Sequence, residues 1–151
     1  MKKIVIICVL VCSQFACYCQ EIYSKMDART LLGIMRDEGY SVSLDKDADI
    51  IWKKDGVRSC ILFSDGNKEQ TNFYFLCSFK IDQDKVAKAL AISNEFNKSK
   101  RFGKSYVRKD AVVFNLPLNL RDGVTKRRII DYLDDCQRVF NVWKKEVLDK
   151  I

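Results

Sequence analysis

Apolar residues near the C-terminal end of the chain recur at intervals of four and three, and this spacing constrains the fold more than any other feature. Such intervals place side chains on one face of an α-helix. We therefore expect a long helix that opens at Thr125 and buries its apolar stripe against a sheet. A coiled-coil seam is the alternative, for which the stretch is short. The stripe consists of Ile129, Leu133, Cys136, Phe140, Trp143 and Val147.

Alternating apolar and polar residues earlier in the chain predict a series of β-strands. Asp55-Gly56 is typical of a hairpin turn, and Asp65-Gly66-Asn67 marks a second turn. In the strand after it, Phe73 and every second residue to Phe79 share one face. The expected strands are 40–44, 50–52, 58–64 and 72–79, followed by a short hairpin of 106–108 and 111–116.

Helix start and stop signals predict two further helices. Ser24 and Asp27 form a capping box at the start of the first, and Gly39 supplies its left-handed end. Asp82 is expected to cap the second. These helices span about 26–38 and 83–97, and the inner side of the second carries Val86, Ala89 and Leu90. The element order is thus α-β-β-β-β-α-β-β-α, an α+β fold in which helices cover an antiparallel meander.

The composition of the chain narrows its chemistry. Its 151 residues, 48% hydrophobic and 31% charged, suit one ordinary packed domain. It contains no histidine. That removes Ser-His-Asp and Cys-His catalysis together with the commonest zinc ligand. We expect no cofactor and a function that is not enzymatic.

The first 19 residues have the pattern of a secretory signal peptide. A basic start precedes an apolar run from Ile4 to Cys12. The whole stretch from Ile4 to Cys19 is only 16 residues long and contains Ser13 and Gln14, so it is too short and too polar for a stable spanning helix. We expect cleavage after Cys19, which leaves a single domain over 20–151 in a periplasmic or secreted protein. A lipoprotein acylated at Cys17 is the alternative.

Three cysteines follow the leader, and their odd number leaves at least one thiol unpaired or joined to a partner. Cys60 and Cys77 fall on successive predicted strands, so a cross-strand disulfide between them is conceivable. We favour the alternative that these two and Cys136 are small buried hydrophobic residues, because cysteine is among the most buried residue types.

Three alternate carboxylates, Asp45, Asp47 and Asp49, begin like a calcium loop. Ile50 and Gly56 stand where an EF-hand needs glycine and glutamate, so we expect an acidic turn and no metal site. A hydrolase that uses two carboxylates distant in sequence leaves no local signature and stays open as an alternative.

Positive charge is concentrated between residues 98 and 128. This window holds ten basic and two acidic residues, whereas the other residues after the leader comprise 15 basic and 18 acidic ones. Three cations also fall in the first turn of the last helix, where the helix dipole disfavours them. We expect a docking face for an acidic protein segment, an anionic lipid or an acidic glycan. Its candidate residues are Lys98, Lys100, Arg101, Lys104, Arg108, Lys126, Arg127 and Arg128.

The window from residue 98 to residue 128 has two other interpretations besides docking. In the first, the cations form an ordinary solvated face, some of them paired with Asp131, Asp134 and Asp135 one turn onward. In the second they bind nucleic acid, which we do not expect, because export separates the chain from it and no stacking platform surrounds Phe102 and Tyr106.

Several short motifs accompany the long helix: Leu31-Leu32, Glu38-Gly39-Tyr40, Asn94-Glu95-Phe96-Asn97, Arg101-Phe102, Lys104-Ser105-Tyr106, Leu116-Pro117-Leu118 and Asp122-Gly123-Val124-Thr125. Together they resemble the bacterial YbjN family over about residues 26–147. The chain departs from the family pattern at Phe96, where tryptophan is common, and at Asp110-Ala111, where Asp-Gly is common.

The resemblance implies a fold similar to type III secretion chaperones, in proteins described as sensory-transduction regulators without an established catalytic activity. From the residues themselves, Asn94 and Asn97 are expected to end the second helix and tie down the loop after it. Arg101 is a candidate tether for a neighbouring carbonyl.

The sequence therefore predicts a non-enzymatic binding or chaperone-like protein that holds a polypeptide through a sheet face or groove. A homodimer is a further expectation. The alternatives are an envelope-associated protein that contacts anionic lipid or glycan, and the carboxylate hydrolase.

Overall fold

The computed structural model describes residues 21–151, so the predicted leader, its predicted cleavage site and Cys17 lie outside the described residues. The strands are β1 (Ile22–Tyr23), β2 (Val42–Leu44), β3 (Ile50–Lys54), β4 (Val57–Leu62), β5 (Asn72–Lys80), β6 (Lys104–Arg108), β7 (Ala111–Asn119) and β8 (Val124–Thr125). The helices are α2 (Ala28–Asp37), α3 (Val86–Ser99) and α4 (Lys126–Glu146), with 3-10 turns at Gln83–Lys85 and Leu148–Lys150. None of these helices is long and apolar enough to cross a membrane.

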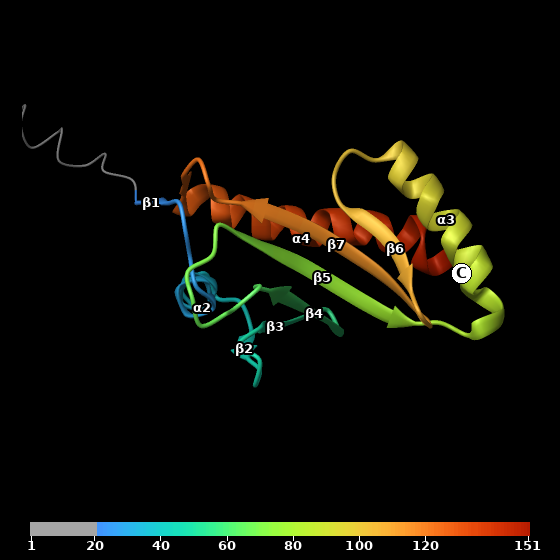
Figure 1. The fold of residues 1–151 in the computed structure, drawn as a ribbon, viewed down its shortest axis with the longest axis horizontal. Helices are drawn as coiled ribbons and strands as arrows, with labels where there is room; N and C mark the ends of the chain where they lie inside the picture. Colours follow the sequence, from blue (N-terminus) through green and yellow to red (C-terminus); the bar gives the residue numbers. More distant parts are fainter. Residues whose placement is uncertain (1–20) are drawn as a thin grey trace, which may run out of the picture.

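Six strands form one antiparallel sheet in the order β2-β3-β4-β5-β7-β6, and β1 pairs separately with β8 (Figure 1). Apart from the two-residue strands β1 and β8, the predicted order of helices and strands is confirmed, and so is the meander of β2 to β5. The hairpin of β6 and β7 joins the same sheet because β7 pairs with β5 along its whole length. Strands of two residues carry no alternation, which is why β1 and β8 are absent from the prediction.

One face of the sheet is packed against the long helix α4, which runs along β5 and β7 (Figure 1). Along β5, Phe73, Phe75 and Cys77 are buried while the residues between them are more exposed, as predicted. All six residues of the apolar stripe are buried, which confirms the amphipathic helix packed on a sheet. Phe114 and Trp143 lie at the centre of this interface, with ring centroids 5.5 Å apart.

The cap of the first helix differs from the prediction. Asp27, rather than Ser24, is the N-cap, and its carboxylate accepts a hydrogen bond of 2.8 Å from the Thr30 amide. Met26 cannot belong to the helix because its amide and carbonyl both bond to Gln70 in an extended bridge. The helix therefore begins two residues later than the capping-box interpretation placed it.

The other two predicted helix ends are confirmed. Gly39 has φ +81° and its amide donates to the Arg36 carbonyl at 2.9 Å, which is the left-handed end expected of it. Thr125 caps α4, since its hydroxyl accepts a hydrogen bond of 3.1 Å from the Arg128 amide.

In the second helix, the predicted cap and part of the predicted inner face are wrong. Asp82 makes no side-chain cap hydrogen bond, because a 3-10 turn intervenes before α3 begins at Val86. Leu90 is 46% exposed. The buried face instead follows α-helical spacing through Ala89, Ser93 and Phe96.

The register of the sheet contradicts a disulfide between Cys60 and Cys77. Cys60 stands opposite Leu76 on the open face, whereas Cys77 projects into the core opposite Phe114. All three thiols are free, and burial raises the pKa of Cys60 to about 11 and that of Cys77 to about 12. Cys77 and Cys136 are the buried hydrophobic residues expected, while Cys60 is half-buried.

Candidate functional site

Two adjoining hollows form a continuous groove along α4, between that helix, the loop after α3 and the end of β7. Their volumes are ≈ 150 and ≈ 260 Å³, and both are lined by Phe102, Arg138 and Val139. We call this the α4 groove. Its remaining residues are Phe96, Lys100, Arg101, Leu116, Pro117, Arg128, Tyr132, Asp135 and Val142.

The groove exposes an unusual amount of apolar surface. Phe102 is 72% exposed and Val142 is 40% exposed, although both are large hydrophobic residues. Gly103, which follows Phe102, has φ +75° and packs directly against the Phe114 ring, so the backbone turns sharply there. An aromatic side chain held in solvent beside further apolar residues is typical of an interaction site.

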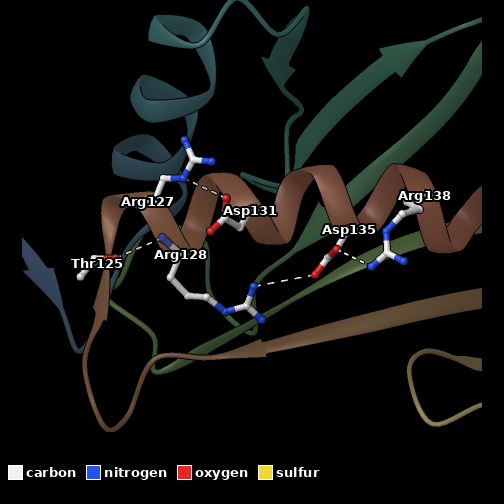
Figure 2. A network of polar contacts seen from close by, with 6 residues as sticks. All are labelled: Thr125, Arg127, Arg128, Asp131, Asp135 and Arg138. Atoms are coloured by element: carbon white, nitrogen blue, oxygen red, sulfur yellow. Dashed lines mark hydrogen bonds and ion pairs between the residues drawn. The ribbon is translucent and has the colours of Figure 1, made fainter.

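The charge of the groove is mainly positive, with four cations and one acidic residue in its lining. Asp135 lies between two arginines of α4, at 3.8 Å from Arg128 and 2.7 Å from Arg138 (Figure 2). Lys100 pairs with Glu146 at 2.7 Å. Arg101 is exposed and forms no ion pair within residues 21–151, nor is its predicted tether to a carbonyl found there.

The floor of the groove is built around the hydroxyl of Tyr132. This hydroxyl donates to the Leu116 carbonyl at 2.6 Å and accepts from the Phe75 amide at 3.1 Å. Phe75 and Leu116 are register partners in β5 and β7, so one side chain from α4 links the two strands. Burial raises the pKa of Tyr132 well above its ordinary value, and the phenol stays protonated as a donor.

We expect Tyr132→Phe to lower the free energy of unfolding by about 1–3 kcal/mol, because two buried hydrogen bonds between α4 and the sheet are lost. The measurement is urea unfolding followed by circular dichroism. Tyr106→Phe is the matched control. Tyr106 lies on β6 and is 38% exposed, so this substitution should change the free energy of unfolding by no more than about 0.5 kcal/mol. Equal losses for both variants would contradict the structural role of the Tyr132 hydroxyl.

The loop that carries Phe102 is tied to α3 by a side-chain amide. Asn97 donates to the Ser105 carbonyl at 2.7 Å and accepts from the Ser105 amide at 2.8 Å, as predicted for its loop contact. Neither asparagine ends the helix, however, because α3 continues to Ser99. Asn94 is exposed within it.

The structure divides the eight predicted basic residues between several surfaces. Lys100, Arg101 and Arg128 line the α4 groove, and Lys104 and Arg108 lie on the edge strand β6. Lys98 is on α3, 4.0 Å from Glu95. Lys126 and Arg127 are at the start of α4 and pair with Glu38 and Asp131 at 3.7 and 3.0 Å. The charged window is thus not one continuous face, and the expected pairing of cations with acidic residues occurs in α4.

Sequence reasoning missed four residues of the groove, which are Tyr132, Arg138, Val139 and Val142 on α4. They lie beside the apolar stripe rather than within it, so the helical pattern gave no reason to single them out. The one available signal was a pair of valines three residues apart on the same helix.

The acidic turn behaves as expected. The Asp45 carboxylate accepts the amides of Asp47 and Asp49 at 2.9 and 3.0 Å, and Asp49 accepts the Phe63 amide at 3.3 Å. These carboxylates therefore hold their own backbone. In the part of the chain that the structure describes, no group of three histidine, cysteine or acidic side chains could hold a metal ion.

Comparison with known proteins gives one family and a shared fold. The sequence profile of the YbjN family, described as "Putative bacterial sensory transduction regulator", matches residues 27–142. No curated protein matches the chain. The solved structure of "YbjN, a putative transcription regulator from E. coli" has a TM-score of 0.65 and 17% identity, covering 78% of this chain and 87% of that one. An uncharacterized protein from Methanothermobacter thermautotrophicus has a TM-score of 0.53 and 14% identity, covering 83% of this chain and 99% of that one.

Proposed function

Because this chain belongs to the YbjN family, described as bacterial sensory-transduction regulators, we propose that it is a non-enzymatic protein that binds a polypeptide partner in the α4 groove. The observation that carries the proposal is Phe102, which is 72% exposed and lines the same hollow as two cations, Arg101 and Arg138. Such a combination suits a partner segment that is both acidic and apolar.

Each part of the groove has a defined role in this binding. Phe102, Val139 and Val142 offer apolar contacts that a partner side chain can cover, and such contacts supply most of the affinity in peptide recognition. The arginines Arg101 and Arg138 offer planar donors that match carboxylates. Because cations outnumber acidic residues in the lining, a negatively charged segment is attracted and a basic one repelled.

The place of this binding is part of the proposal. The leader over residues 1–19 directs the protein out of the cytoplasm, as a periplasmic or secreted protein or as a lipoprotein. Contact with anionic lipid or glycan is less supported, because the predicted basic residues are divided between several surfaces and do not form one continuous face. A homodimer stays a prediction.

The test is selection from a random 12-residue peptide display library with the purified protein as bait. We expect enriched peptides that combine Asp or Glu with Leu, Ile or Phe. Phe102→Asp should weaken the selected peptide by about 30-fold, as expected for a central anchor residue. Fluorescence anisotropy of the labelled peptide measures both affinities.

The control is Leu90→Asp, which places the same charge on another exposed apolar residue that does not line the groove. Its affinity should match that of the original protein. A library without enriched sequences would contradict the proposed function, and so would equal weakening by the two variants.

A further inference from the structure

We propose that the partner occupies the α4 groove as an amphipathic helix lying along α4, and not as a strand added to the sheet. This inference rests on the proposed function and gives the conformation of the bound segment. It is carried by the backbone groups along the sheet edge next to the groove, together with the spacing of the side chains on α4.

The outer edge of β6 is already occupied at Ser105. Asn97 satisfies both the amide and the carbonyl of Ser105, at 2.8 and 2.7 Å, in the way that a neighbouring strand would. An incoming extended peptide would have to displace this side chain before it could pair with β6. Covering a sheet edge with a side chain is one way in which proteins prevent added strands.

The edge of β7 beyond β6 lacks a backbone donor at one position. In an antiparallel ladder, alternate residues direct their backbone groups to opposite sides. The backbone groups of Ser105 point away from β7, so the backbone groups of its neighbour Lys104 point toward β7, where Lys104 is paired with Asn115. The next residue of β7 with the same orientation is Pro117, the only proline of the chain, and it has no amide to donate. An added strand therefore finds no donor at this point of the groove wall.

The side chains of α4 suit a second helix. Arg128 and Arg138 both reach the Asp135 carboxylate, at 3.8 and 2.7 Å, so their guanidinium groups converge on one point of the groove. A helix aligned with α4 can offer a carboxylate at this point. Beyond Arg138 on the same helix, Val139 and Val142 form an apolar ridge at the three-residue spacing that helices use when they pack together. The exposed Phe102 ring closes the other side of the groove.

The experiment uses the best peptide from the library selection in three forms: unmodified, with a proline at its centre, and with a covalent staple between side chains four residues apart. If the bound peptide is a helix, the central proline should weaken binding by about 100-fold, because it removes a hydrogen bond and clashes with the preceding turn. The staple should tighten binding severalfold by ordering the helix beforehand. Affinities are measured by fluorescence anisotropy.

Hydrogen exchange of the peptide amides in the complex supplies a second readout. A bound helix protects consecutive amides in the middle of the peptide, whereas an added strand protects alternate ones. Alternate protection, or a proline form that binds as tightly as the unmodified peptide, would overturn the helical inference. In that case, weaker binding by Phe102→Asp alone would still support the proposed function. If Phe102→Asp did not weaken binding more than Leu90→Asp, both the proposed function and the helical inference would be contradicted.

Discussion

Replacing Trp143 with alanine is expected to lower the free energy of unfolding by about 3–5 kcal/mol, a large part of the stability of an ordinary domain. Trp143 is fully buried and packs on the rings of Phe114 and Phe140, with centroids 5.5 and 5.8 Å away. Its indole N–H also donates to the Ser105 hydroxyl at 2.8 Å, and that hydroxyl in turn donates to the Ser93 hydroxyl. The substitution therefore opens a cavity and breaks a polar chain that joins α4, β6 and α3.

Trp143→Phe separates these two effects. It keeps most of the ring contacts and removes only the donor, so we expect a smaller loss of about 1–3 kcal/mol. Unfolding in urea should be followed by circular dichroism, because the substitutions remove one of the two tryptophans of the chain. An alanine variant within about 1 kcal/mol of the original protein would show that the aromatic centre does not hold the helices to the sheet.

The elements that could be predicted from sequence are those whose pattern is local. The α4 stripe repeats within one helix, and the alternation from Phe73 to Phe79 repeats within one strand, so each is visible in a short window. Gly39 and Thr125 follow the same logic, because a helix end depends on a few neighbouring residues. Ser24 failed as a cap because a long-range bridge between Met26 and Gln70 takes precedence over the local motif.

The candidate site could be predicted only in part, because it is assembled from distant segments. Phe102 and Arg138 line the same hollows although 36 residues separate them in sequence. Their encounter depends on how α3 and its loop are placed against α4, which no local pattern encodes. The charged window shows the reverse error, since neighbours in sequence such as Lys100 and Lys104 fall on different surfaces.

The two residues that protect the free edges of β6 and β7 can be seen in the sequence, but their role at those edges cannot. Asn97 was expected to tie down a loop, and its contact with Ser105 confirms that expectation. That the same contact also covers the free edge of β6 follows only from the strand order. The meaning of Pro117 likewise depends on which side of β7 its backbone faces.

Gly103→Ala is expected to destabilise the protein by about 2–5 kcal/mol, because it combines backbone strain at positive φ with a steric clash in the core. Gly103 has φ +75°, and a Cβ atom there would lie 2.5 Å from the Phe114 ring. Phe114 is fully buried and cannot move without disturbing Trp143. The same residue ends the loop that holds Phe102 in the groove, so peptide binding should weaken together with stability.

Gly33→Ala is the matched control, and it should have the opposite sign. Gly33 lies within α2, has no atom within 4 Å of the added Cβ, and does not have a positive φ. Alanine there should stabilise the helix by about 0.5–1 kcal/mol, because it removes backbone freedom from the unfolded chain. Urea unfolding of both variants measures the difference directly. If both substitutions shift the midpoint in the same direction, the tight turn at Gly103 does not set the path of the Phe102 loop.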